Sequence, residues 1–154
     1  MSPTMNAIFL MRHMAAHFFS ESVALRMLYD WALFLKKYAK EVDWKLVLPL
    51  YEKAGMPKFS RMIQEILISK LGWDFSDCPI EPINDAMTER IWKSIIESPE
   101  SNPYRMNSIR YLIYEAKVFY ANRWKHGLVF KDESYWYLFY SYTWQHLKKK
   151  IGLN

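Results

Sequence analysis

Residues 9–34, FLMRHMAAHFFSESVALRMLYDWALF, indicate how this chain folds. They comprise two apolar segments with helical spacing, joined by the polar turn Ser20-Glu21-Ser22. Ionisable side chains stand among the methionines, leucines and aromatic residues: Arg12, His13, His17, Arg26 and Asp30. Buried ionisable groups need partners, because desolvation without one is costly. The stretch therefore predicts a helix–helix seam with a polar cluster, whose role the residues themselves leave open.

The composition is that of a globular helical domain. The 154 residues suit one domain with a single core. Hydrophobic residues make up 51% and charged residues 24%, which excludes a disordered chain. Only 4 glycines argue against a turn-rich β-barrel and favour long helices. The aromatic content of 18% predicts either a large core or a surface that meets a partner.

Cysteine content and the N-terminus predict a soluble cytoplasmic protein. Cys78 is the one cysteine and cannot form an intramolecular disulfide, which fits a reducing compartment. Residues 1–4 lack the basic start of a secretory signal, and the apolar run that follows contains Arg12 and His13. No stretch approaches the roughly 18 uncharged apolar residues of a spanning helix, so no membrane partner is expected.

Apolar periodicity and capping residues predict about seven helices and no strand. The expected helices run from Met5 to about Phe19, Val23 to Lys40, Trp44 to Ala54, Lys58 to Leu71, Asn84 to Glu97, Tyr104 to Lys125 and Tyr135 to Lys150. Asp43 is the predicted N-cap of the third helix, and Gly55 and Gly72 end the third and fourth. Gly127 is expected to end the sixth, and Leu128-Val129-Phe130 to be extended.

These helices predict an all-α fold, an orthogonal or irregular bundle in a single domain over residues 1–154. Residues 73–83 hold two prolines and no periodicity, so they form an irregular connector and a candidate sub-domain seam. In the second helix, the residues expected to face inward are Leu25, Leu28, Ala32 and Leu35.

The net charge of +5 is unevenly distributed. Residues 1–104 hold 12 basic and 13 acidic residues, whereas residues 105–154 hold 9 and 3. The basic C-terminal third could attract phosphates or acidic surfaces, although a solvated helix face and a solubilising lysine tail explain it equally. Arg123, Trp124 and Lys125 are candidate phosphate or nucleic-acid contacts, through stacking and ion pairing. Arg123 and Lys125 could equally lie there because cations are favourable at the negative end of a helix dipole.

Two pairs of ionisable residues have i, i+4 spacing on the first two helices. His13 and His17 could share a metal ion, but the glutamate base that metalloproteases place between two such histidines is missing. We therefore favour the interpretation that both are core or interface histidines bonded to neighbouring residues. No metal site or catalytic residue is therefore predicted. Arg26 and Asp30 can form an ion pair. Their apolar neighbours favour a half-buried pair in which Arg26 also reaches His13 or His17.

Arg12 and His17 form an Arg-x4-His pattern that resembles the short motif of the HEPN domains, helical bundles that often act as ribonucleases. The resemblance implies a homodimer in which the histidine is the base and the arginine binds phosphate. Residues five apart differ by about 500° around a helix, so the two side chains of one chain diverge.

A longer resemblance covers most of the chain. The residues that carry it are Pro3-Thr4, Asn6 to Met14, His17-Phe18, Leu25-Arg26, Asp30-Trp31-Ala32, Phe34-Leu35, Val42-Asp43-Trp44, Asn122 to Lys125, and Trp144 to Leu147. This pattern resembles the C-terminal helical half of the uncharacterised bacterial nucleotidyltransferases common in Bacteroides-type bacteria. The resemblance implies a partner, the catalytic nucleotidyltransferase domain.

Catalytic domains of this superfamily use a Gly-Ser turn followed by an Asp-x-Asp pair, which holds Mg²⁺ and a nucleoside triphosphate. This sequence has neither; Asp74-Phe75-Ser76-Asp77 has the wrong spacing. Met1 directly before the first helix also suggests a product without the catalytic half. No cofactor is expected in this chain itself, and Mg²⁺ and nucleotide would enter only with a catalytic half elsewhere.

The resulting hypothesis is a non-catalytic helical accessory domain. It would position the nucleotide or acceptor, or pack on the catalytic domain, with His13, His17, Arg26 and Asp30 as its polar centre. Two alternatives remain: an RNA-cleaving homodimer using Arg12 and His17, and an interaction module with a basic, aromatic C-terminal surface.

Overall fold

The computed structural model describes residues 1–20, 23–97, 103, 109–129, 134, 136, 137 and 140, and within them all regular structure is helical. The helices are α1 (Pro3–Ser20), α2 (Leu25–Tyr38), the 3-10 turn η1 (Ala39–Glu41), α3 (Trp44–Lys53), α4 (Pro57–Leu71), α5 (Ala86–Ile96), α6 (Ile109–Ala121) and α7 (Arg123–Val129). The predicted all-α fold class is confirmed. The first five α-helices also lie within a few residues of their predicted ranges.

Short polar side chains and glycines set several helix ends. The Asp43 carboxylate accepts a hydrogen bond from the Leu46 N–H at 3.3 Å, which confirms the predicted cap of α3. Asp85 caps α5 by accepting from the N–H groups of Met87 and Thr88 at 2.8 and 3.0 Å. Gly72 ends α4 with a φ of 70°, a left-handed conformation that glycine adopts without strain.

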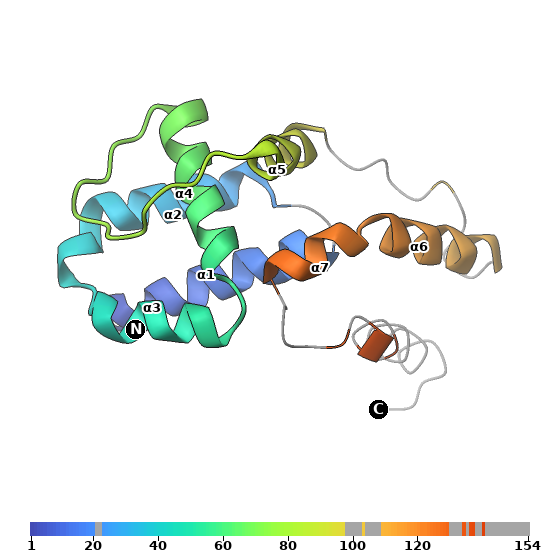
Figure 1. Ribbon diagram of the computed structural model, residues 1–154, viewed down its shortest axis with the longest axis horizontal. Helices are drawn as coiled ribbons and strands as arrows, with labels where there is room; N and C mark the ends of the chain where they lie inside the picture. The colour runs from blue at the N-terminus through green and yellow to red at the C-terminus, as the bar shows by residue number, and fades with distance from the viewer. Residues whose placement is uncertain are drawn as a thin grey trace.

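Two helices organise the core. Helix α1 packs against α2, α3 and α7, and α4 packs against α2, α3, α5 and α7 (Figure 1). The Phe18 ring of α1 stacks on Phe59 of α4 at 5.0 Å and meets Trp124 of α7 edge-on at 5.6 Å. Aromatic contacts of this kind stabilise beyond the area they bury. Three helices distant in sequence therefore meet around Phe18.

The connector before α5 is irregular, as predicted, but it is joined to the core. Phe75 and Ile80 are buried, and Trp73 stacks on Phe75 with ring centroids 5.9 Å apart. The Arg61 side chain donates to the Glu81 carbonyl at 2.9 Å, which ties the connector to α4. Residues 73–83 therefore pack as part of the same core as α4.

The predicted sixth helix is interrupted. Helix α6 ends at Ala121, and α7 starts at Arg123 after a turn at Asn122, whose carbonyl accepts from the Lys125 N–H at 2.9 Å. The predictions for residues 127–129 were wrong: Gly127 lies inside α7, and Leu128 and Val129 are helical and buried. Packing against α1 and α4 outweighs the local extended preference of these two residues.

Several predictions fall outside the described residues: the Ser20–Ser22 turn beyond its first residue, the start of the sixth helix at 104–108, Phe130, and nearly all of the helix expected at 135–150.

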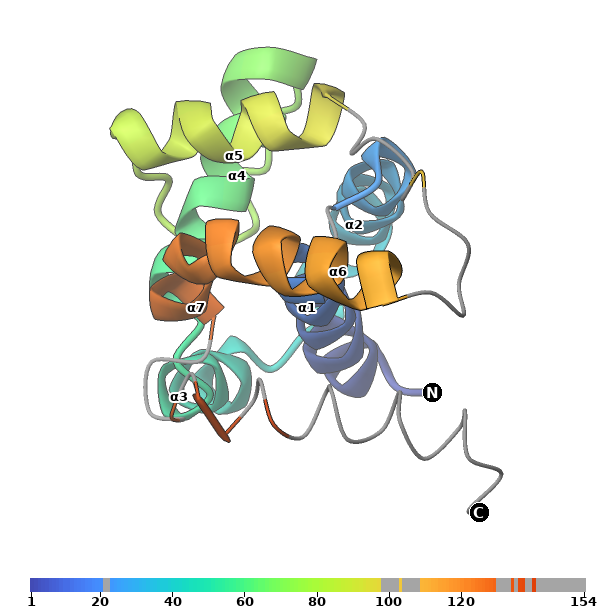
Figure 2. The same ribbon diagram turned by 90° about the vertical axis from the view of Figure 1, so that its right-hand side faces the viewer.

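Figure 2 shows α6 crossing in front of α1, and in Figure 1 it extends away from α2, α3 and α4. Among the described helices, none has both the length and the apolar content to cross a bilayer.

Candidate functional site

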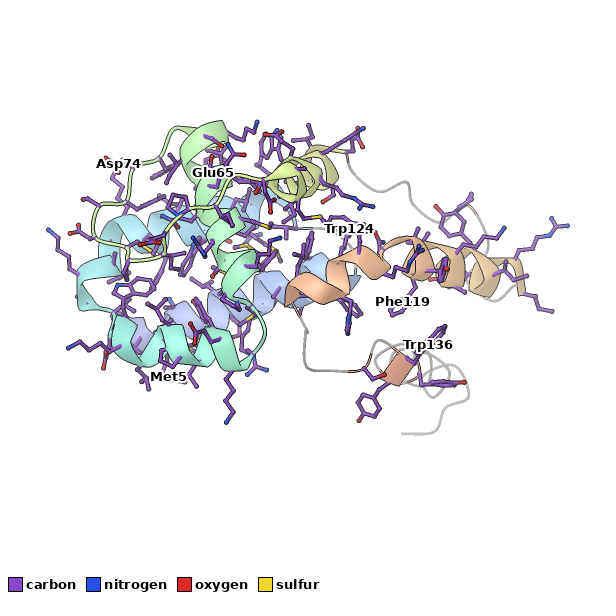
Figure 3. All side chains as sticks on the ribbon, in the orientation of Figure 1. Met5, Glu65, Asp74, Phe119, Trp124 and Trp136 are labelled. Atoms are coloured by element: carbon purple, nitrogen blue, oxygen red, sulfur yellow. The ribbon has the colours of Figure 1, made fainter. Side chains whose placement is uncertain are left out.

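One side of α1 carries a row of exposed residues. Met5, Phe9, Arg12, His13 and Ala16, here called the α1 outer face, are all exposed. They recur at intervals of three and four, so they share one arc of the helix. The Phe9 and His13 rings stack at 5.5 Å with planes 8° apart, and His13 meets the half-buried His17 edge-on at 4.6 Å. Figure 3 shows Met5 at the edge of the molecule beside α3.

The opposite side of α1 is apolar and enclosed. Its fully or almost fully buried residues are Ala7, Met11, Met14, Ala15 and Phe18. The ionisable groups of α1 therefore lie on the side away from the core, with His17 at its margin. This division follows directly from the helical period of the sequence.

Arg26 and Asp30 form the predicted ion pair on α2, with Nε and Oδ2 3.6 Å apart. The prediction that this pair is half-buried was wrong for Arg26, because the side chains are 89% and 51% exposed. An exposed pair of this kind contributes at most a few tenths of a kcal/mol. Leu25, at the start of α2, was predicted to face inward and is also exposed.

The four residues of the predicted polar centre thus form two pairs, one within each helix. His13 contacts His17 on α1, and Arg26 contacts Asp30 on α2. The buried residues of α2 are apolar: Leu28, Trp31, Ala32, Phe34 and Leu35. A buried polar seam through His13, Arg26 and Asp30 is excluded by their exposure. Their participation in a binding face remains a prediction.

Neither metal nor ribonuclease chemistry receives support from the geometry of α1. Within the described ranges, no three histidine, cysteine, aspartate or glutamate residues are placed to hold a metal ion. Arg12 is exposed and His17 is half-buried. The dimeric ribonuclease would need a second copy of the chain, so this alternative stays a prediction.

The basic aromatic group at the start of α7 is distributed between surface and core. Lys125 is only 2% exposed, with its ammonium 5.1 Å from the Phe18 ring centroid and 6.0 Å from that of Trp124. Burial lowers the pKa of Lys125 to about 8, since desolvation disfavours the charged ammonium. Lys125 is thus a core residue, and the prediction that it contacts an external phosphate was wrong.

Trp124 and Arg123 have defined partners in the structure. The Arg90 guanidinium of α5 lies 4.1 Å from the Trp124 ring centroid, and Figure 3 shows Trp124 where α7 faces the other helices. Arg123 is exposed and lies 4.4 Å from the Tyr120 ring centroid. Such cation–π contacts anchor side chains at the surface. Of the three predicted phosphate contacts, Arg123 is the exposed cation.

A shallow cavity of about 200 Å³ lies between α3, α4 and the connector. The hydroxyl groups of its lining are already bonded within the protein. The Tyr51 hydroxyl donates to the Ala7 carbonyl at 2.9 Å, and the Ser60 hydroxyl donates to the Pro57 carbonyl at 3.0 Å. Burial raises the pKa of Tyr51, so its hydroxyl stays protonated. The Tyr51 hydrogen bond joins α3 to α1, and the Ser60 hydrogen bond lies within α4. We assign no ligand to the cavity.

The sequence did not predict that the apolar part of the α1 outer face is exposed. Met5 and Phe9 begin the same i, i+4 row that leads to His13 and His17. That row was the available signal. The Arg90–Trp124 contact had no signal in the sequence, because it joins residues 34 positions apart on different helices.

A family described as uncharacterised nucleotidyltransferase matches residues 1–67, a little under half of the 154 residues. The matched segment contains α1 to α3 and most of α4. No curated protein and no solved structure matches the chain. The match supports a relationship between this helical segment and nucleotidyltransferases, and it includes the whole α1 outer face.

Proposed function

We propose that this chain is a helical accessory part of a nucleotidyltransferase-type protein, and that its α1 outer face packs on the catalytic domain. The observation that carries the proposal is the exposure of Met5 and Phe9 inside the segment that matches the nucleotidyltransferase family. Around them, Arg12 and His13 supply polar contacts. A partner domain would bury an apolar strip that this chain leaves in water.

The composition of this face is suited to an interface. Interface cores are enriched in aromatic residues, methionine and arginine, and all three occur on the α1 outer face. Stacking between Phe9 and His13 orients both rings without a partner. A preoriented ring loses less conformational freedom when it binds.

In this proposal, the chain does not itself transfer nucleotides. The reaction needs carboxylates that hold Mg²⁺ against the triphosphate. The sequence contains no Asp-x-Asp pair and no Gly-Ser turn. It therefore lacks the motif whose carboxylates bind Mg²⁺ in nucleotidyltransferases. Mg²⁺ and the nucleoside triphosphate would be held by the catalytic domain, and the accessory helices would support it.

The test is binding to a separately produced catalytic domain from a protein of the matched family, one that contains the Gly-Ser and Asp-x-Asp elements. Isothermal calorimetry should detect a complex, and Phe9→Ser should weaken it by about tenfold or more, since interface aromatic residues often contribute more than 1.4 kcal/mol. Leu33→Ser is the matched control, because Leu33 is an equally exposed apolar residue on α2.

Two results would overturn the proposal. Equal weakening by Phe9→Ser and Leu33→Ser would show that the α1 outer face has no special role. Transfer of radiolabelled nucleotide to an acceptor by this chain alone, with Mg²⁺ present, would show that it is an enzyme. Circular dichroism of both variants verifies that they remain folded.

A further inference from the structure

We propose that α6 carries a second docking surface, which binds an acidic amphipathic helix of a protein partner. The surface consists of Ile109, Ile113, Ala116 and Tyr120, here called the α6 stripe. It lies outside the segment that matches the nucleotidyltransferase family. The inference is therefore independent of the proposed role of α1.

The α6 stripe is a continuous apolar row in water. Ile109 is 77%, Ile113 51% and Tyr120 56% exposed, and Ala116 between them is also exposed. Spacings of four, three and four residues place all of them within one narrow arc of the helix. A groove-binding helix uses the same spacing for its anchors.

Helix α6 is apolar on more than one side. Ten of its thirteen residues are apolar or aromatic. On another side, Phe119 meets Phe19 of α1 edge-on at 5.5 Å, which joins α6 to the body of the protein. A helix that is hydrophobic around most of its circumference is normally covered on more than one side. We therefore expect the α6 stripe to have a binding partner of its own.

The charged residues beside the stripe indicate which kind of partner would bind it. Arg110 and Lys117 are exposed and follow one border of the stripe, at about 80–100° from Ile109 by helical geometry. Arg123 lies near the opposite border, with its guanidinium 4.4 Å from the Tyr120 ring centroid. Among the described side chains, the charged ones beside the stripe are cationic. A partner helix with an apolar face and carboxylates beside it would complement both features.

The same charges disfavour other occupants. In a two-fold dimer of this chain, the stripe would face its own copy and bring the cationic borders together. Like charges across an interface are unfavourable. Nucleic acid would use the cations but would leave Ile109 and Ile113 without apolar contacts, since phosphate contacts dominate such binding.

The experiment uses the full chain and two labelled helical peptides of about 20 residues, long enough to form helix on binding. Both have leucines at the spacing of the stripe; one has glutamates along its borders, and the other has lysines. By fluorescence anisotropy, the glutamate peptide should bind at least about tenfold more tightly, and added salt should weaken it. Ile113→Asp should abolish this binding, and Leu33→Asp on α2 should not.

A charge exchange makes the test specific. The double variant Arg110→Glu/Lys117→Glu should reverse the preference and select the lysine peptide. Equal binding of the two peptides, or no binding of either, would overturn the proposal. So would a concentration-dependent dimer that Ile113→Asp dissociates, or tighter binding of a single-stranded RNA. Protection of Tyr120 from hydroxyl-radical oxidation in the free monomer would likewise overturn it, because the chain itself would then cover the stripe.

Discussion

Helices α4 and α6 are similar in length and rich in apolar residues, yet they have opposite surroundings. Helix α4 buries seven of its residues: Phe59, Ser60, Met62, Ile63, Gln64, Ile66 and Leu67. Helix α6 leaves Ile109, Ile113 and Tyr120 largely in water. Apolar spacing therefore identifies a helix face that excludes water in a complex or a core, but tertiary packing decides whether this chain buries that face itself. Mutations in the two helices should separate these two cases.

The largest contrast is expected between Phe59→Ala in α4 and Ile113→Ala in α6. Phe59 is fully buried against Phe18, so its truncation should lower the free energy of unfolding by about 3–5 kcal/mol. Ile113 is exposed, so its truncation should change the free energy by less than about 0.5 kcal/mol. Urea denaturation measures both.

If Phe59→Ala fails to fold, Phe59→Leu provides the same comparison at a smaller scale, with an expected loss of less than about 1.5 kcal/mol. A loss for Ile113→Ala as large as that for Phe59→Ala would contradict the comparison. It would show that α6 is packed within this chain.

A second contrast concerns lysines. Burial places the pKa of Lys125 at about 8 in the folded protein, against 10.5 for an ordinary lysine. Between these pH values Lys125 binds more protons in the unfolded chain than in the folded protein, so the contribution of Lys125 to the free energy of unfolding should rise with pH. Lys125→Met should be more stable than the wild type near neutral pH, and the gap should close by roughly 2–3 kcal/mol as pH rises through this window.

The control for this contrast is Lys117→Met, which alters an exposed lysine of α6. Its stability should follow the wild-type pH profile in urea denaturation from about pH 7 to pH 10.5. If Lys125→Met also followed that profile, Lys125 would not be a desolvated cation of the core.

The smallest contrast is between two carboxylates. Asp85 caps α5 and lies 3.1 Å from the Lys58 ammonium. Burial alone would raise the pKa of Asp85, but the Lys58 hydrogen bond and the two backbone N–H donors outweigh it and lower the pKa. Asp85→Ala should therefore cost about 1 kcal/mol at neutral pH, and this difference should diminish as acid protonates the wild-type carboxylate.

Asp30→Ala is the matched change for an exposed ion pair and should cost less than about 0.5 kcal/mol. Thermal unfolding followed by circular dichroism resolves the two variants. Equal losses would contradict the distinction between a helix cap and a surface ion pair.

The fold was predictable where local chemistry determines it. Asp43 and Gly72 mark the start of α3 and the end of α4 through hydrogen bonds and backbone geometry within a few residues. The break at Asn122 and the helical state of Leu128 and Val129 were not predictable in this way. They depend on how α7 packs against α1 and α4, which are distant in sequence.

The candidate site was predictable only in part. The i, i+4 spacing correctly paired His13 with His17 and Arg26 with Asp30. Exposure of Arg26 and burial of Lys125 were missed, because the side of a mixed helix that faces the core depends on its neighbours. The predicted binding centre consisted of ionisable residues, whereas the exposed apolar rows of α1 and α6 supply the stronger argument for binding.

The turn at Asn122 also has a mechanical meaning. Helix α7 is held in the core through Leu128 and Val129, while α6 extends beyond the body (Figure 1). Helix α6 is thus anchored near its C-terminal end at two places: Phe119 contacts the buried Phe19 of α1, and the first turn of α7 holds Trp124 under the Arg90 guanidinium. A load on the outer end of α6 would therefore reach the core through the Phe19 ring and the Trp124 indole.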